Sequence, residues 1–359
     1  MSRSLGFTGD IVFVSGTESM WGAERSLLGL ASGIHDRTPN RVSLVGTSGA
    51  LVDEWRRALP DCPAETVRLP PRFLRELSLV LAAWRRAPRG SALVLFEFRL
   101  IVTLPLLVML ARVKGMRVVV DVHDSPEESS RRALIAQLLR LVDSAVCVSS
   151  YIAEQLPTTR THVVFRPMDT ASPAERTVDL DRIVVGVIGQ IARHKRVEAA
   201  FKLISAGENR MSCVVRGASS GVDGENYLAE VNAAAVEIGG RRAMVEPAVE
   251  PAHALDGIDV LFAGNPMEPS SRAVAEAQMR GIPAVVPDRG GAQEFIKDRV
   301  TGFVYPVDDP GSIATDLLGM SSQDWETMSR RARAWAASEF DRDSQVAKYV
   351  NAVWARASD

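Results

Sequence analysis

The sequence has few cysteines and no long hydrophobic run, and each shortage excludes a class of protein. Its 359 residues include only three cysteines, Cys62, Cys147 and Cys213, which do not cluster as zinc ligands do. Two of them lie in apolar, strand-like runs, which predicts buried free thiols in a reducing compartment. The longest aliphatic run, residues 100–110, is shorter than the roughly 20 residues that cross a bilayer. We expect this run to form a buried helix.

The sequence also has no excess of charge of one sign. Lys and Arg together number 42 and Asp and Glu 44, so the formal net charge is −2 at pH 7. This balance, with 46% hydrophobic residues, excludes a disordered chain and gives no overall nucleic-acid footprint. We therefore expect no nucleic-acid partner. Asp10 precedes the first apolar run without a signal-peptide layout, so we expect a cytoplasmic protein.

Two common nucleotide-binding motifs are missing. A dehydrogenase is expected to show G-x-G-x-x-G directly after a strand, and a P-loop enzyme G-x-x-x-x-G-K-S/T. Residues 15–22, SGTESMWG, follow the first expected strand, but Gly16 and Gly22 are too far apart and no lysine follows. A phosphate site has to be built in another way.

The sequence does contain two series of short β-branched runs that alternate with stretches of helical length. The first series comprises residues 11–15, 41–46, 92–96, 117–122, 144–150 and 162–165, and the second 183–189, 212–217, 243–247, 259–264, 283–287 and 302–306. This alternation predicts two doubly wound α/β domains with a polar linker at 168–181. Ligands bind such sheets at the carboxyl ends of strands, so two facing domains predict a cleft between them.

Two glutamates bracket the stretch EPSSRAVAE. Pro269 suits the first turn of a helix and the serines after it are good caps, so Glu268 is expected in the loop before a helix that contains Glu276. Free backbone N–H groups at such a helix end bind phosphate readily. A ribose diol presents two adjacent O–H donors, which the Glu276 carboxylate can accept. The stretch therefore suits a nucleotide with a group attached.

Residues 268–310, EPSSRAVAEAQMRGIPAVVPDRGGAQEFIKDRVTGFVYPVDDP, resemble the E-x7-E region and the following glycine-rich turn of the retaining glycosyltransferases of family 4. Further segments resemble that family in the same order: MWGAERSLLGLASGI at 20–34, VVVDVHDSPEE at 118–128, VDSAVCVSSYIAEQL at 142–156, RPMD at 166–169 and VIGQIARHKRVEAAF at 187–201. The ordered set covers nearly the whole chain and is highly specific.

The resemblance implies the GT-B fold, in which two facing Rossmann-like, doubly wound domains enclose an interdomain cleft. Residues 1–170 would form the N-terminal acceptor domain and residues 171–340 the domain that binds the nucleotide-sugar donor. Residues 341–359 would form a helix that crosses back onto the first domain.

The resemblance also assigns residues to the reaction. His123 would contact the donor sugar, and Glu268 would accept from the sugar hydroxyls and stabilise positive charge at the anomeric carbon. These two are the expected catalytic residues. The expected donor-binding residues are Gly22, Gln190, Arg193, Lys195, Ser270, Ser271, Arg272, Glu276 and Glu294.

The cations near the expected phosphate site depart from the family pattern. Lys195 is the best candidate to neutralise the charge that grows on the leaving nucleoside diphosphate. The family commonly has an arginine where Gln190 stands. Arg193 either supplies the missing guanidinium or is a surface charge.

The loops around the donor carry further expectations. The backbone amides of Ser270, Ser271 and Arg272 would approach the diphosphate. Gly22 would let the backbone come close to the phosphate or the sugar. Glu294 either lies near the nucleotide or serves as a carboxylate at a helix N-terminus.

Two D-x-D sequences occur, at 179–181 and 341–343. This pattern serves metal-dependent glycosyltransferases of another fold, but here the first lies in the linker and the second at a helix start, where aspartates cap. We therefore expect neither a metal nor a cofactor, because a helix end and a lysine would hold the diphosphate.

The acceptor side is less determined. Residues 68–90 have many arginines beside apolar side chains, which is compatible with a helix resting on an anionic membrane and, in the preferred interpretation, with a core-packed helix whose arginines are solvated. FEFR at 96–99 departs from the histidine-containing loop of the family. The acceptor hydroxyl could belong to a small molecule, a glycan or a lipid-linked molecule, and weak peripheral contact with the inner membrane face stays open.

The resulting hypothesis is a metal-independent, retaining glycosyltransferase that uses front-face attack. A non-catalytic sugar-nucleotide-binding protein is the first alternative, since Gln190 departs from the family pattern. Another GT-B enzyme, such as a sugar-nucleotide epimerase or a phosphorylase, is the second.

Overall fold

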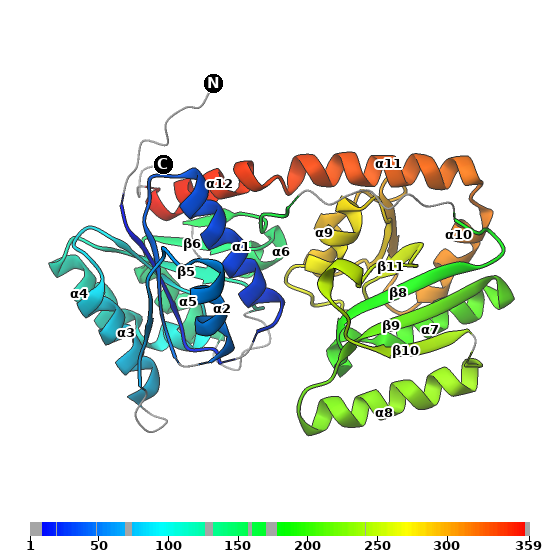
Figure 1. Cartoon of the computed structure of the whole chain (residues 1–359), viewed down its shortest axis with the longest axis horizontal. Coiled ribbons are helices and arrows are strands. Elements are labelled where there is room, and N and C mark those ends of the chain that lie inside the picture. Colours follow the sequence, from blue (N-terminus) through cyan, green and yellow to red (C-terminus); the bar gives the residue numbers. More distant parts are fainter. Residues whose placement is uncertain are drawn as a thin grey trace. The chain divides into compact units, whose positions relative to one another are not determined.

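A computed structural model describes residues 9–18, 20–47, 49–68, 74–125, 132–156, 160–169, 178–240 and 242–355. The chain divides into two compact units, one made of Met1–Asp169 with Phe340–Asp359 and the other of Thr170–Glu339 (Figure 1). From the sequence, these boundaries are predicted after residues 170 and 340.

The first unit contains a seven-stranded sheet in which every neighbouring pair is parallel. Its strands are β1 (Ile11–Ser15), β2 (Val42–Gly46), β3 (Ala64–Thr66), β4 (Ala92–Leu95), β5 (Arg117–Val122), β6 (Ser144–Cys147) and β7 (Thr161–Val163). They lie in the order β3-β2-β1-β4-β5-β6-β7. Its helices are α1 (Gly22–Arg37), α2 (Ala50–Ala58), α3 (Arg75–Arg86), α4 (Leu104–Val113), α5 (Arg132–Leu138), α6 (Ser150–Glu154) and α12 (Arg342–Trp354), with 3-10 helices η2 (Phe98–Thr103) and η4 (Leu139–Leu141).

Strand β3 is missing from the strands predicted for this unit. Its sequence is Ala-Glu-Thr, without an apolar run, and its middle residue is exposed. A three-residue strand at a sheet edge takes its structure from pairing with β2 and carries little pattern of its own.

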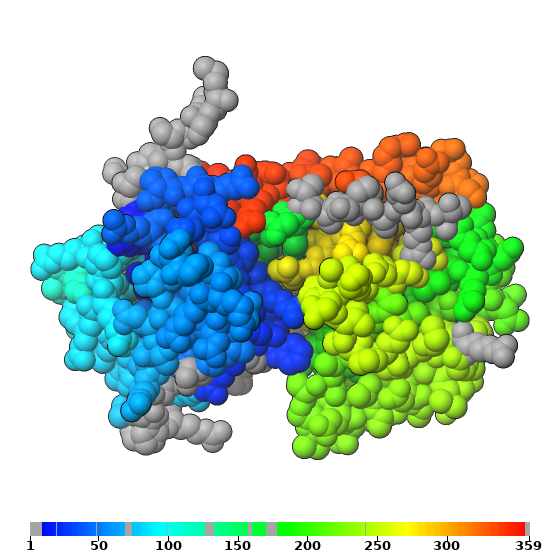
Figure 2. Space-filling model, in the orientation of Figure 1, coloured from blue at the N-terminus to red at the C-terminus, as the bar shows by residue number. Residues whose placement is uncertain are grey.

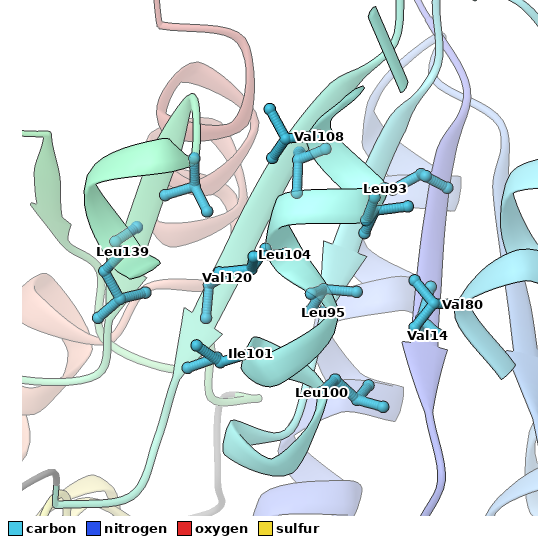
Figure 3. Close-up of a cluster of buried hydrophobic side chains, with 14 of the residues drawn as sticks. Val14, Val80, Leu93, Leu95, Leu100, Ile101, Leu104, Val108, Val120 and Leu139 are labelled. Atoms are coloured by element: carbon cyan, nitrogen blue, oxygen red, sulfur yellow. The ribbon is translucent and has the colours of Figure 1, made fainter. Parts of the chain in front are cut away.

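The sheet of the first unit has an apolar core on each face. Successive side chains of a strand point to opposite faces, so Val12 and Val14 join one core while Ile11 and Phe13 join the other. The first core is filled from α3, α4 and η4, and Figure 3 shows Val80, Leu104, Val108 and Leu139 gathered around β1, β4 and β5. The second core is filled from α1, α2 and α12.

Helix α12 belongs to the first unit although it follows the second unit in the sequence. Its apolar side chains lie in the same core as α1. The two helices approach closely at Gly33, where an added Cβ would lie 2.5 Å from Val346 Cγ2. Arg117 Nε at the start of β5 donates to the carbonyl of Val353, 2.9 Å away, near the end of α12.

The second unit contains a six-stranded parallel sheet. Its strands are β8 (Ile183–Gln190), β9 (Met211–Ala218), β10 (Ala243–Pro247), β11 (Val260–Phe262), β12 (Ala284–Pro287) and β13 (Gly302–Tyr305), in the order β10-β9-β8-β11-β12-β13. Its helices are α7 (Val197–Ala206), α8 (Gly221–Ile238), α9 (Arg272–Met279), α10 (Ala314–Gly319) and α11 (Ser322–Glu339), with 3-10 helices η5 (Arg193–Lys195), η6 (Glu208–Arg210), η7 (Pro251–His253), η8 (Gly291–Phe295) and η9 (Pro310–Ile313). The prediction of two doubly wound α/β domains is confirmed.

The expectation of a buried helix at 100–110 is only half right. The run forms η2 and α4, and one face enters the core, but Val102, Leu106 and Met109 are exposed. The error arises because apolar content alone does not show which face of a helix has a partner. Among the described helices, none has the length and the apolar character needed to cross a membrane.

The three cysteines are free and buried, which confirms the prediction made for the two that lie in apolar, strand-like runs. Cys147 lies in β6 and Cys213 in β9, and burial raises the pKa of each of these thiols to about 12.

Candidate functional site

The order of the strands places a switch point in the second sheet between β8 and β11. The chain leaves β8 towards β9 and β10 on one side, and returns to β11, β12 and β13 on the other. The loops that follow β8 and β11 therefore leave the same edge of the sheet side by side, which is where open α/β sheets bind ligands. Lys195 follows β8 and Glu268 follows β11.

Lys195 and Glu268 form an ion pair at this edge. Lys195 Nζ donates to both carboxylate oxygens of Glu268, at 2.8 Å and 2.7 Å. Asn265 Nδ2 donates to Glu268 Oε2 at 2.9 Å and fixes the carboxylate from its own loop. The two charged residues are predicted from the sequence, but Asn265 is not. Its signal is a polar side chain in the loop just after an apolar strand.

Two glycines let the loops of this edge come together. An added Cβ at Gly264 would lie 2.6 Å from the carbonyl oxygen of Lys195, so a side chain there would separate the two loops. Gly290 has φ +83° and lies against the carbonyl of Pro266, where an added Cβ would be 2.8 Å away. The left-handed conformation and the close approach both favour glycine.

Helix α9 begins next to this ion pair. Ser271 is its N-cap residue and is buried, and in the described structure its side chain makes no capping hydrogen bond. Arg272 Nε donates to Glu276 Oε1 at 2.7 Å, one turn apart on the helix. Ser270 and Ser271 thus lie at the positive end of a helix, and Glu276 lies half-buried on its second turn in an ion pair with Arg272.

The other predicted residues of the β8 loop point elsewhere. Arg193 donates through Nη1 to Glu230 Oε2 on α8 at 2.7 Å, and its guanidinium lies over the ring of Tyr227. Gln190 Nε2 donates to Ser220 Oγ at 2.8 Å. The structure therefore brings Lys195 to Glu268, and it pairs Arg193 with another partner.

Glu294 lies on the short helix η8 and is half-buried. The backbone amide of Gly291, at the start of η8, donates to the carbonyl of Glu268 at 2.7 Å. This hydrogen bond joins the loop after β12 to the loop that carries Glu268.

His123 follows β5 in the first unit, directly after a buried strand that contains a carboxylate. Its ring packs against Phe96, with centroids 4.3 Å apart. Its Nδ1 lies 3.9 Å from Asp121 Oδ1 and its Nε2 3.7 Å from Asp124 Oδ2, and within the described residues the buried Nδ1 has no hydrogen-bond partner. Burial lowers the pKa of His123, but the two carboxylates outweigh burial and raise this pKa above its ordinary value.

Asp121 joins three segments that are distant in the sequence. Arg166 Nη1 donates to Asp121 Oδ2 at 3.0 Å, and the hydroxyl of Tyr349 on α12 donates to the same oxygen at 2.8 Å. Burial raises the pKa of Asp121, but Arg166 and His123 outweigh burial and hold this pKa well below its usual range. Asp121 is therefore an ionised carboxylate inside the first unit.

Asp121, Arg166 and Tyr349 are not among the residues predicted from the sequence. A signal for Asp121 is present, because a carboxylate within an apolar strand has to be paired when it is buried. Its two partners come from residues far along the chain, so the pairing itself required the fold.

The loop after β1 carries Gly22 at the first position of α1. An added Cβ at Gly22 would meet no described atom within 4 Å, so the space beside its Cα is open. Glu24 Oε2 accepts from the backbone amide of Trp21 at 2.8 Å and so stabilises the start of the helix. At the neighbouring end of β4, Glu97 Oε1 accepts from Ser15 Oγ at 2.7 Å.

The D-x-D sequence at 341–343 lies at a helix start. Asp341 is the N-cap residue of α12 and accepts from the amide of Ser344 at 2.8 Å. Within the part of the chain that the structure describes, there is no group of three or more His, Cys, Asp and Glu side chains placed to hold a metal ion.

Comparison with known proteins finds sequence similarity over the second unit. Residues 169–335 match the model of the family described as "Glycosyl transferases group 1". A GDP-mannose-dependent alpha-mannosyltransferase of Mycobacterium tuberculosis (strain CDC 1551 / Oshkosh) is 29% identical over 176 residues, which cover 46% of this chain and 43% of that relative.

Solved structures share the fold across nearly the whole chain. HepE of Anabaena in complex with UDP matches with a TM-score of 0.80 and 19% identity over 95% of this chain and 99% of that one. A glycosyltransferase of Rickettsia africae ESF-5 matches with a TM-score of 0.77 and 14% identity, over 97% and 98%. The lipopolysaccharide outer core galactosyltransferase WaaB matches with a TM-score of 0.71 and 16% identity, over 97% and 99%.

The fold is thus that of the GT-B glycosyltransferases, as predicted. Residues 169–335, which contain Lys195, Glu268 and the start of α9, are similar to the glycosyl transferases group 1. The predicted resemblance to glycosyltransferases is thus found in this part of the chain, whereas the activity of the whole chain and membership of family 4 stay predictions.

Proposed function

We propose that the chain transfers a sugar from a nucleoside-diphosphate sugar to a hydroxyl acceptor, with retention at the anomeric carbon and without a metal ion. The observation that carries the proposal is the ion pair between Lys195 and Glu268 beside the start of α9. It lies within the residues that match the glycosyltransferase family.

The second unit supplies the features that a nucleotide sugar needs. The start of α9 and the ammonium of Lys195 both attract anions, so they bind the diphosphate together. The carboxylate of Glu276 accepts from the ribose hydroxyls, while its ion pair with Arg272 holds it in place. Glu294 lies near the nucleotide, on the loop fastened to Glu268.

The chemistry is then mostly electrostatic. As the bond between the sugar and the phosphate breaks, negative charge grows on the diphosphate and positive charge on the anomeric carbon. Lys195 neutralises the first charge and Glu268 stabilises the second. The acceptor oxygen attacks from the face that the phosphate leaves, its proton passes to a phosphate oxygen, and the anomeric configuration is kept.

The positive charges of Lys195 and of the helix end take the place that a divalent cation has in other glycosyltransferases. His123, which Asp121 and Asp124 favour in the charged state, is proposed to contact the donor sugar. The support for this contact is the family resemblance of residues 118–128, and residues 126–128 lie outside the described residues.

Two nucleotides are the first to test. The mannosyltransferase relative uses GDP-mannose by its name, and the HepE structure contains UDP. We infer that one of these bases belongs to the donor of this chain.

The test is the thermal stability of the protein with UDP, GDP, ADP and TDP, each with and without EDTA. A ligand at about 100 times its dissociation constant adds about 2.7 kcal/mol to the free energy of unfolding, which is readily measured. We expect one nucleotide to stabilise the wild type and Glu225→Ala, an exposed helix control, but not Glu276→Ala, and EDTA to leave the shift unchanged.

Two other outcomes would each contradict a different part of the proposal. Stabilisation by none of the four nucleotides would contradict the proposed donor site. A shift that EDTA abolishes would contradict metal independence alone.

A further inference from the structure

Helix α4 is apolar apart from Arg112, yet one of its faces is exposed. Val102 in η2, and Leu106, Met109 and Val113 in α4, are 47%, 36%, 58% and 70% exposed. Leu106, Met109 and Val113 are spaced three and four residues apart, which places them on one face of α4, and Val102 lies four residues before Leu106 in η2. On the opposite face, Leu104, Leu107, Val108 and Ala111 are buried in the core of the first unit.

A helix that is apolar on two opposite faces is typically covered by apolar groups on both. The exposed face of α4 is therefore suited to bind an apolar partner. The helix has ten residues and is about 15 Å long, roughly half the hydrocarbon thickness of a bilayer. It is therefore suited to lie against a membrane surface rather than to cross the membrane.

The neighbouring helices also expose apolar side chains. η2 contacts α5, and α4 contacts η4. Leu134 on α5 and Leu141 after it are also exposed. We call the set Val102, Leu106, Met109, Val113, Leu134 and Leu141 the outer face of α4, and the segment around residues 100–115 lies on the visible surface of the first unit, in cyan, in Figure 2.

The charges along these segments are all of one sign. Residues 98–120 and 129–142 contain arginines and one lysine but no Asp or Glu. Arg112 and Arg140 are exposed beside the apolar side chains. Lys114 Nζ instead donates to the carbonyl of Trp84, 2.7 Å away near the end of α3. We therefore do not count Lys114 among the cations that would contact lipid.

This combination favours one kind of partner. Apolar side chains flanked by cations bind a surface that has an apolar interior and anionic headgroups. A second copy of the same face would bring the arginines of both copies together, which disfavours a symmetric dimer. The arginine-rich helix α3 exposes less apolar surface for such contact, because its apolar Leu79, Val80 and Ala83 pack into the core.

We propose that the outer face of α4 docks on an anionic lipid membrane. The apolar side chains enter the boundary between headgroups and acyl chains, and Arg112 and Arg140 contact lipid phosphates. This surface belongs to the first unit and needs no nucleotide, so docking is separate from the proposed transfer.

The test is co-sedimentation of the full chain with vesicles of phosphatidylcholine, with and without phosphatidylglycerol, at low and high salt. We expect binding to the anionic vesicles that weakens at high salt. Met109→Asp with Val113→Asp should weaken it by about tenfold or more, because two exposed apolar side chains no longer enter the bilayer. Met109→Ser with Val113→Ser, and separately Arg112→Gln with Arg140→Gln, should each weaken it by less.

The matched control is Val222→Asp with Val236→Asp on α8, at positions that are 73% and 75% exposed. This variant should bind vesicles like the wild type, and all variants should keep the wild-type circular dichroism and nucleotide-induced thermal shift. Absence of vesicle binding by the wild type, or equal binding by the α4 variant, would overturn the proposal. A wild-type dimer in analytical ultracentrifugation that Met109→Asp with Val113→Asp dissociates would show instead that a second copy covers this face.

Discussion

Two ion pairs organise the candidate residues of the two units. In the second unit Lys195 meets Glu268, and in the first Arg166 meets the buried Asp121. The sequence could predict that Lys195 and Glu268 belong to one site, because both match a family motif. It could not predict which cation faces the glutamate, because the partner of Arg193 depends on how α8 packs.

The first prediction separates these two cations. Lys195→Ala should weaken binding of the stabilising nucleoside diphosphate by about tenfold to a hundredfold, since hydrogen bonds to charged groups contribute about 1.5–3 kcal/mol. Arg193→Ala should change binding by less than about threefold, because Arg193 is engaged with Glu230 at the exposed surface. Isothermal titration calorimetry measures both, and the reverse ranking would mean that Arg193 replaces the family arginine.

The second prediction concerns the protonation of His123. Its pKa is raised above the ordinary value near 6.5, so its charged form stabilises the fold below pH ~6.5, and that contribution is lost as the pH rises through the raised pKa. The free energy of unfolding should therefore be larger below pH ~6.5 than above the raised pKa, as far as this group contributes. Proton NMR of the five histidines, with the signal that His123→Gln removes, gives the titration directly.

Asp124→Asn is the matched change for this measurement. Asp124 is exposed, so its replacement should leave the fold intact while lowering the pKa of His123. A wild-type His123 that titrates below its ordinary value would show that burial outweighs the two carboxylates.

At the scale of elements, helices and strands with a clear period could be predicted, and elements defined by their neighbours could not. The strands predicted at residues 11–15 and 92–96 follow from their apolar runs, whereas β3 exists through its pairing with β2. The outward face of α4 was missed for the same reason. Which side of an apolar helix is covered depends on the sheet beneath it, and the sheet is assembled from distant segments.

The contact of α1 with α12 gives the third prediction. Gly33→Ala should destabilise the protein by about 1–3 kcal/mol, because the new Cβ would meet Val346 and force the helices apart. Gly29→Ala, one turn earlier on the same helix, meets no atom of the described residues within 4 Å and should stabilise by up to about 1 kcal/mol through helix propensity.

Urea denaturation followed by circular dichroism distinguishes the two glycine variants. Opposite signs are expected, and the first should appear in the transition of the first unit. If both substitutions stabilise, α12 does not pack on Gly33.

At the scale of the whole molecule, the chain forms two α/β units, and α12, which follows the second unit in the sequence, packs in the first one. Tyr349, near the C-terminus, donates to Asp121, which lies two residues before His123. The end of the chain is thereby part of the environment of a candidate catalytic residue. The alternating runs of the sequence predicted the two sheets, but a contact across 228 residues could be seen only in the fold.

The central claim is sugar transfer, and the most direct measurement uses the nucleotide sugar whose base stabilises the protein. The wild type is incubated with this donor and with pools of glycan, lipid-linked and small-molecule acceptors, and products are followed by mass spectrometry and NMR. We predict an acceptor enlarged by one sugar with the donor's anomeric configuration, free nucleoside diphosphate, and a rate about a hundredfold lower for Glu268→Gln, which should still bind nucleotide. Nucleotide binding without modification of any acceptor, or conversion of the donor sugar when no acceptor is present, would contradict the account.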